Sequence, residues 1–304
     1  MEQLIATTLR TSAPIALVAM GGVIAWRAGI FHLGLEGLMV IGAFFAVAGT
    51  LATGEVLIGL LAAIVACLIA SAIFWVVIVP MKANMIIAGL GLSIIGVGFT
   101  SYLLPVLYGK RGILEVDQGL WRPITGVNGG MIDALSELSV MVWLVPPIVL
   151  AVWVLVRRTR FGLRLLAVGE YPFAARSAGV DVARMRLIAL LLCGVFCALG
   201  GAALALGSLV AFKENMTEGR GYIAFTAVIF GGGGPIGAAL ASLFFGFAEA
   251  LGIQSQLFAK DLPIPSQMIL MLPYILTVVA VFISGLASGG RNRQPGAFGE
   301  LRDG

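Results

Sequence analysis

Two carboxylates and one histidine stand inside long apolar stretches of the chain, where polar side chains are rare. Glu36 follows the only histidine, His32, by four residues, so the two would share one face of a helix. Glu249 lies in the apolar run FFGFAEA. A carboxylate at the centre of a bilayer costs about 2.5 to 3.5 kcal/mol on insertion scales, and such residues commonly mark a transport path. The residues predicted to line or gate such a path are His32, Glu36 and Glu249.

Each carboxylate also has a purely structural interpretation. Glu36 is near the start of an apolar segment, where free backbone amides and the helix dipole stabilise a negative charge. Glu249 would be an ordinary polar residue if it reached the outer membrane interface. A lone histidine such as His32 is more often an interfacial side chain than a functional one.

A run of four glycines and a proline, residues 231–235, interrupts a later apolar stretch. Both residue types carry a large cost inside a helix, so we expect a short segment over residues 221–230, a break, and a helix over residues 236–251. Broken helices are tolerated in lipid where the freed backbone is buried or lines a water-filled path. Close packing of helices through small residues is the alternative. The further path candidates are Gly231, Gly232 and Gly233.

Catalysis by this chain is not expected. A nucleophile–histidine pair would have to use His32, and no nucleophile signature accompanies it. The three cysteines, Cys67, Cys193 and Cys197, all fall in apolar runs, where a thiol behaves as a small hydrophobic group. We therefore expect no disulfide, no metal site and no cofactor bound by this chain.

The composition indicates an integral membrane protein. Apolar residues make up 60% and charged residues 11% of the 304 residues, and the mean hydropathy is +1.06, whereas an average soluble domain is about 25% charged. A spanning helix needs about 20 apolar residues, so the fold expected is an all-α polytopic bundle of about eight to ten membrane segments. The basic residues sit at segment ends without interleaved aromatics, so nucleic acid is not an expected partner.

The expected membrane domain covers residues 1–290, followed by a polar tail over residues 291–304. We place the full-length segments, in chain order, at residues 5–26, 33–52, 56–79, 85–107, 140–156, 187–210, 236–251 and 266–286.

A basic loop, residues 157–186, separates two of these segments. It holds seven arginines against two carboxylates, a local charge of +5. Because basic loops are retained in the cytoplasm, this loop and the polar tail should be cytoplasmic, and alternation places the N-terminus on the outer side. Pro172 suits the first turn of a helix and Gly179 the position past its end, which predicts a helix over residues 172–178. Residues 161–168 are expected to continue the preceding membrane helix, with a turn at Gly169–Glu170. A merely solvated loop is the alternative.

Three collinear stretches resemble one family of membrane proteins. They are AWRAGIFHLGLEGLMVIGAFFAV, FGLRLLAVGEYPFAARSAGV and GRGYIAFTAVIFGGGGPIGA. Together they are similar to the permease subunits of bacterial ATP-binding-cassette importers for nucleosides, ribose-type sugars and branched-chain amino acids, and closest to the nucleoside branch. The resemblance covers roughly residues 10–286. His32 stands where asparagine is usual in that family, and Gly233 where tryptophan or asparagine is frequent.

The resemblance implies the helical permease fold of these importers in a bacterial inner membrane. It implies three protein partners besides membrane lipid: an ATPase that binds ATP and Mg²⁺, a second and non-identical permease, and an extracytoplasmic solute-binding protein or lipoprotein. Within the basic loop it implies a coupling segment that seats on the ATPase. The residues carried over to that role are Gly162, Arg164, Gly169, Glu170, Pro172, Ala174, Ala175 and Gly179.

The function expected is therefore import of a nucleoside or ribose-type sugar, driven by ATP hydrolysis in the partner. A branched-chain amino acid permease is one alternative. A proton-coupled secondary transporter that uses Glu36 and Glu249 is another, and a structural or channel-type membrane component is a third.

Overall fold

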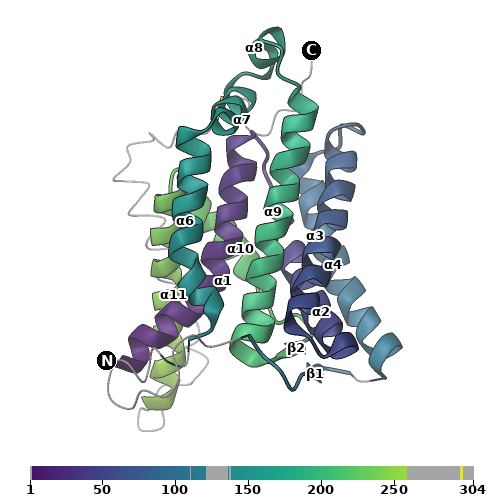
Figure 1. Cartoon of the computed structure of the whole chain (residues 1–304), viewed down its shortest axis with the longest axis vertical. Coiled ribbons are helices and arrows are strands. Elements are labelled where there is room, and N and C mark those ends of the chain that lie inside the picture. The colour runs from purple at the N-terminus through teal and green to yellow at the C-terminus, as the bar shows by residue number, and fades with distance from the viewer. Residues whose placement is uncertain (1, 110, 121–135, 137, 259–294, 297–304) are drawn as a thin grey trace.

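The computed structural model describes residues 2–109, 111–120, 136, 138–258 and 295–296. Seven helices in this part of the chain are long and apolar enough to cross a membrane (Figure 1). They are α1 (Glu2–Arg27), α2 (Leu35–Thr53), α3 (Val56–Ile78), α4 (Met85–Tyr108), α6 (Val140–Arg158), α9 (Val182–Leu204) and α11 (Pro235–Phe258). The predicted polytopic helical bundle is thus confirmed. The segment expected over residues 266–286 lies outside the described residues, as does the polar tail apart from residues 295–296.

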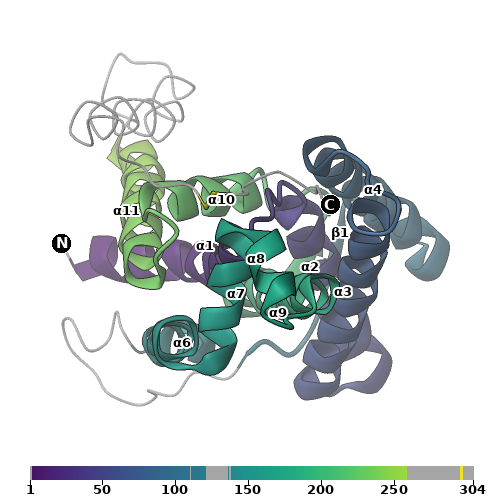
Figure 2. The same ribbon diagram turned by 90° about the horizontal axis from the view of Figure 1, so that it is seen from above.

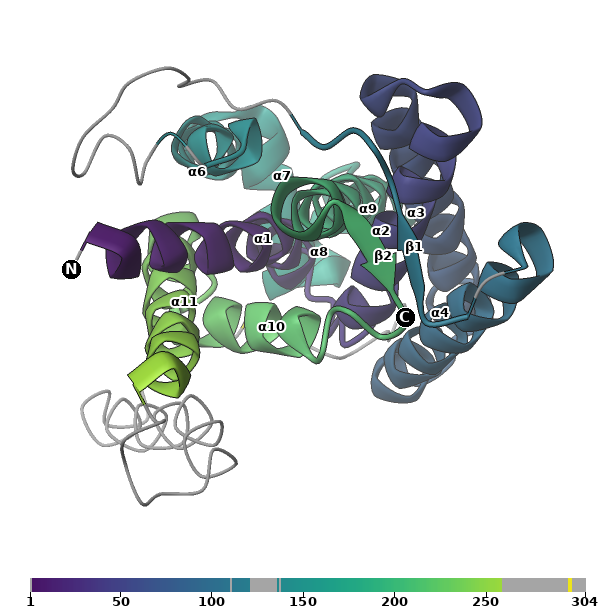
Figure 3. The same ribbon diagram turned by 90° about the horizontal axis from the view of Figure 1, so that it is seen from below.

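Shorter elements connect these helices. The shorter elements are β1 (Ile113–Glu115), α7 (Arg160–Glu170), α8 (Pro172–Ser177), the π-helical turn η1 (Ala205–Leu209), β2 (Ala211–Lys213) and α10 (Arg220–Phe230). These short elements distinguish the two ends of the bundle. α7 and α8 lie at the end where α1 finishes, whereas the N-terminus, β1 and β2 lie at the opposite end (Figures 1 and 3).

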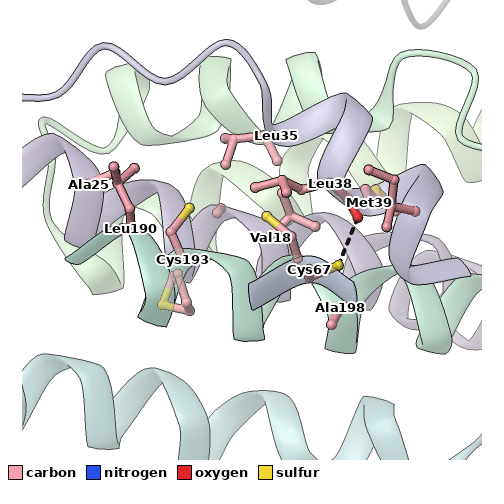
Figure 4. Close-up of a cluster of buried hydrophobic side chains, with 14 of the residues drawn as sticks. Val18, Ala25, Leu35, Leu38, Met39, Cys67, Leu190, Cys193 and Ala198 are labelled. Carbon is pink, nitrogen blue, oxygen red and sulfur yellow. Dashed lines mark hydrogen bonds between the residues drawn. The ribbon is translucent and has the colours of Figure 1, made fainter. Parts of the chain in front are cut away.

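Helix α1 forms the centre of the bundle. It packs against α9, α10 and α11, and α2 packs against α3, α4 and α9. Every residue of α1 from Ser12 to Trp26 is buried, as expected for a helix that is apolar on all sides. Figure 4 shows the core where these helices meet, with Val18, Leu38 and Cys193 close together and the Cys67 thiol donating to the Leu38 carbonyl at 3.2 Å.

Helix α3 is different because one of its faces is apolar and exposed. Exposed leucine, valine and isoleucine side chains recur every fourth residue, which places them on one stripe of the helix. The members of this stripe are Leu57, Leu61, Val65, Ile69 and Ile73. An apolar stripe of this length is what a helix at the edge of a membrane bundle presents to lipid or to another membrane chain.

The two strands were not expected from the sequence. They pair antiparallel, with Ile113 opposite Lys213 and Glu115 opposite Ala211. Each strand has only three residues, which is too short for a period-two pattern to stand out. The pairing ties the segment after α4 to the segment after η1 and covers the end of the bundle that is remote from α7.

The membrane-proximal ends of the basic loop differ from the prediction. Helix α6 stops at Arg158 because Thr159 is extended, with φ −106° and ψ 157°. The Thr159 hydroxyl then accepts a hydrogen bond from the Gly162 amide at 3.1 Å and so caps a new helix, α7. The predicted continuation of α6 over residues 161–168 is therefore wrong. α7 also runs through Gly169 and Glu170, so the turn comes at Tyr171.

The predicted start of the next membrane helix is also too late. Asp181 accepts from the Arg184 amide at 3.0 Å and caps α9, which begins at Val182 and not at residue 187. Arg186 is consequently inside the helix and only 1% exposed. The predicted start of this helix was too late because Arg186 was treated as a polar residue outside the membrane segment. A long arginine stem can be buried inside a helix bundle.

Candidate functional site

Helix α10 spans only part of the membrane. Its 11 residues rise about 16 Å at 1.5 Å each, roughly half of a 30 Å hydrocarbon core. It ends in a glycine turn beside Trp26, at the finish of α1, and therefore starts well inside the bundle. A helix that begins there leaves backbone amides without partners in its first turn. These amides must be satisfied by other groups, because water is scarce at that depth.

Glu36 of α2 supplies those partners. Its Oε1 accepts from the Thr217 hydroxyl and from the Gly219 amide at 2.9 Å, and its Oε2 accepts from the Gly221 amide at 2.7 Å. The carboxylate is 3% exposed. Gly221 lies so close that a Cβ atom there would stand 2.5 Å from the Glu36 Cα. Glu36 thus joins the start of α10 to α2, with its charge at the positive end of the α10 dipole.

Glu249 of α11 holds the other side of the same helix start. Its Oε1 forms an ion pair with the Arg220 guanidinium, and Arg220 also donates to the Met216 carbonyl at 3.0 Å. The two side chains are 18% and 20% exposed. Two carboxylates from different helices therefore bracket the first turn of α10, one buried and one partly accessible.

A cavity of about 390 Å³ reaches this ion pair from the end of the bundle opposite α7. Its volume falls in the range typical of small-molecule sites. Charged and hydroxyl side chains share its wall with apolar ones. The lining residues include Thr11, Lys213, Met216, Arg220, Glu249 and Ile253.

The glycine run forms the turn between α10 and α11. Gly232 and Gly233 have φ of +60° and +65°, which L-residues with side chains rarely adopt. Gly231 faces the backbone of Gly237, and a Cβ on Gly233 would stand 2.5 Å from the Trp26 Nε1. The predicted break is present, but it lies at the α7 end of the bundle and is separated from Glu36 by the length of α10. The role of these glycines in a path stays a prediction.

His32 takes no part in this arrangement of hydrogen bonds. It is 1% exposed, and its ring stacks on Phe74 with centroids 4.3 Å apart. Among the described residues, neither of its ring nitrogens has a hydrogen-bond partner. The prediction that the four-residue spacing places His32 and Glu36 on one helix face is wrong, because α2 begins at Leu35 and His32 lies before it. The role of His32 in a path stays a prediction.

The predicted coupling residues divide into two sets of four in α7, α8 and the turn after them. Gly162, Gly169, Pro172 and Ala175 are buried and hold the two helices against the bundle. The set exposed to solvent is Arg164, Glu170, Ala174 and Gly179. The predicted helix is confirmed, with Pro172 at its first position and Ser177 as its last residue, followed by Gly179 at φ +80°.

A shallow apolar groove of about 370 Å³ runs between α7 and α8. Leu163 and Tyr171 border it and are 64% and 61% exposed, and Phe173 beside them is 41% exposed. Figure 2 shows α7 and α8 capping the bundle from above. Large apolar side chains on a projecting surface in water are typical of a docking site.

Sequence reasoning missed three residues of these sites. Thr217 and Arg220 hold the start of α10, and Arg27 donates from Nε to the Gly233 carbonyl at 2.9 Å. Arg220 stands in the GRGYIAF stretch and was available as a polar residue next to an apolar run. Arg27 directly follows the segment predicted over residues 5–26, and its partner Gly233 lies 206 residues away along the chain, so no local pattern indicated this bond.

Comparison with known proteins gives one family match and several similar permeases. The family described as "Branched-chain amino acid transport system / permease component" matches residues 4–281. The guanosine ABC transporter permease protein NupQ of Bacillus subtilis (strain 168) is 36% identical, covering 91% of this chain and 90% of NupQ. The nucleoside ABC transporter permease protein NupC of Lactococcus lactis subsp. cremoris (strain MG1363) is 32% identical, covering 92% of each chain. A putative glucose ABC transporter permease protein, TsgC13 of Haloferax volcanii, is 30% identical over 83% of this chain and 78% of its own.

Proposed function

Because the chain belongs to the family of branched-chain amino acid transport system permease components, we propose that it is the membrane-spanning permease of an ATP-driven importer whose solute is a nucleoside. The observation that carries the solute class is the similarity, over nine-tenths of the chain, to two permeases named for guanosine and nucleosides. The chain itself supplies the path, and ATP with Mg²⁺ is bound and hydrolysed by a separate subunit.

In this proposal, the surface formed by α7 and α8 docks on the ATPase. Its groove is apolar, and its edge carries the exposed rings of Tyr171 and Phe173, whose centroids are 5.9 Å apart. Burying exposed rings and aliphatic side chains in a partner is favourable at roughly 25 cal/mol per Å². The arginines around the groove support a cytoplasmic position for this surface. In this proposal the protein is a multi-pass protein of the bacterial inner membrane with its N-terminus outside.

The solute approaches from the other end, where the 390 Å³ cavity opens. A nucleoside presents hydroxyl groups on its sugar and an apolar face on its base. Glu249 and Arg220 offer an acceptor and donors for hydroxyls, and Met216 and Ile253 offer apolar contact in the same cavity. An extracytoplasmic solute-binding protein delivers the solute at this end, and a second, non-identical permease completes the membrane part of the importer.

Affinity capture of the tagged chain from its native membrane in mild detergent tests the docking surface. An ATPase with an ATP-binding cassette and a second permease should be captured with it. Ala174→Asp should lower the recovered ATPase by tenfold or more, because Ala174 is exposed beside the groove and a charge there must be desolvated on docking. Ala174→Ser, which stays small and uncharged, is the matched control and should retain the ATPase.

Substituting the exposed Ala174, and not the buried Ala175, tests docking of the ATPase without disturbing the fold of α8. Ala175 is 4% exposed, so a charge at that position would disrupt α8 itself. If the Ala174→Asp chain inserts normally and still recovers the ATPase in full, α7 and α8 do not form the docking surface. If the unsubstituted chain is captured with no ATPase in several mild detergents, the importer proposal as a whole fails.

A further inference from the structure

The backbone of α7 rests directly on the end of α1. A Cβ atom on Gly169 would collide with the carbonyl oxygen of Arg27 and stand 3.0 Å from the Gly29 amide. The end of α1 is itself a closed turn, in which the Ile30 amide donates to the Ala25 carbonyl at 3.0 Å and Gly29 has φ +77°. Two backbone segments in contact cannot slide past each other as side chains can. A displacement of α7 is therefore transmitted to this turn.

Arg27 extends the contact to the glycine turn. Its Nε donates to the Gly233 carbonyl at 2.9 Å, and the neighbouring Trp26 ring covers Gly233. Arg27 is half-buried, and Arg157 and Glu170 are the charged groups that act on it. A hydrogen bond from a cation in a partly buried position is stronger than one between neutral groups. The glycine turn is thus tied to the residue that α7 touches.

The glycine turn is one end of α10, whose other end is fixed. Glu36 and Glu249 hold the first turn of α10 to α2 and α11. At the finish of α10, Phe230 packs edge-on against Phe245 of α11, and the turn over residues 231–233 contacts the bundle through its backbone and accepts the hydrogen bond from Arg27. α10 is therefore anchored at its start and connected to the cytoplasmic helices at its finish.

We propose that Arg27 is a positioning residue that transmits movement of α7 and α8 to the turn over residues 231–234, and through it to α10. The proposal rests on the proposed function, since it assumes that the ATPase moves α7 and α8. It assigns Arg27 a role in coupling ATP hydrolysis to solute movement, separate from docking of the ATPase and from binding of the solute.

The test uses the complete importer captured from its native membrane and placed in lipid vesicles together with its binding protein. Phosphate release and uptake of labelled guanosine are measured on the same vesicles. Arg27→Met keeps an unbranched side chain but removes both the cation and every N–H donor that could reach the Gly233 carbonyl. ATP hydrolysis should stay within about twofold of the unsubstituted importer, whereas guanosine uptake per ATP hydrolysed should fall by tenfold or more.

Two further variants make the outcome specific. Arg27→Lys keeps a cation that can donate to the Gly233 carbonyl, and it should restore a substantial part of the uptake per ATP. Lys82→Gln removes an exposed cation at the same end of the bundle, in the connection between α3 and α4, and should leave both activities unchanged.

The possible results separate this inference from the function on which it rests. If Arg27→Met leaves uptake per ATP unchanged, Arg27 does not transmit movement, although the importer function stands. A parallel loss of hydrolysis, uptake and assembled complex would show that Arg27 only stabilises the fold. Absence of ATP hydrolysis in the unsubstituted complex would instead overturn the proposed function.

Discussion

Glu36 is the residue on which the geometry of α10 depends most. A carboxylate placed inside a bundle is costly unless it is fully paired, and this one accepts three hydrogen bonds at the start of α10, from the Thr217 hydroxyl and the Gly219 and Gly221 amides. The same three donors would be unsatisfied without it. A proton-coupled carrier would need to protonate and release this carboxylate in every cycle. The observed bonds favour a constant anchor.

Replacing Glu36 by glutamine tests this anchor. The glutamine amide keeps the size but offers one oxygen acceptor and directs an NH₂ group at a backbone or hydroxyl donor. We expect a loss of about 2 kcal/mol or more in stability, since a buried donor left without a partner costs about 1 to 3 kcal/mol. The readout is the midpoint of thermal unfolding in detergent.

Glu218→Gln provides the matched control for this measurement. Glu218 lies three residues before Gly221 but is exposed, and its carboxylate forms a 3.9 Å ion pair with Lys213. An exposed pair contributes at most about 1 kcal/mol. Its unfolding midpoint should stay near that of the unsubstituted chain. Equal midpoints for both variants would mean that Glu36 does not anchor α10.

At the scale of elements, α2 and α4 approach each other through glycines. A Cβ atom on Gly96 of α4 would stand 2.8 Å from the Cα of Gly37, and one on Gly89 would stand 3.0 Å from the amide nitrogen of Gly34 in the connection that leads into α2. Small residues permit this approach, which gives the dispersion and backbone contacts that hold helices together in lipid. Gly98, two residues after Gly96, has open space around it and faces outward.

The pair of glycines in α4 therefore gives a prediction with an internal control. Gly96→Ala should destabilise the protein by about 1 to 3 kcal/mol, the usual cost of forcing extra volume into a tight contact. Gly98→Ala should be neutral or stabilising by up to about 1 kcal/mol, because alanine favours a helix more than glycine does. Thermal unfolding of the two variants under one detergent condition checks both. Similar destabilisation by both would contradict the observed crossing of α2 and α4.

Across the whole molecule, the sequence predicted those features that depend on local composition. Runs of apolar residues located the seven spanning helices of the described chain, although α9 begins five residues earlier and α11 ends seven residues later than predicted, and Pro172 and Gly179 predicted the short helix α8. The partners of Glu36 and Glu249 could not be predicted, because they lie 181 and 29 residues away along the chain. The same holds for the bond from Arg27 to Gly233. Thr159 was missed because an extended residue between two helical patterns leaves no periodic signal.

In the proposed function, this chain moves a nucleoside inward while its partner hydrolyses ATP. The most direct measurement is uptake of labelled guanosine into lipid vesicles that contain the captured complex, supplied with its binding protein. ATP and a pH gradient are imposed one at a time. We predict uptake that requires ATP and persists after an ionophore has removed the pH gradient. Uptake that needs the gradient and proceeds without ATP would contradict the account and return Glu36 and Glu249 to the role of proton-linked sites.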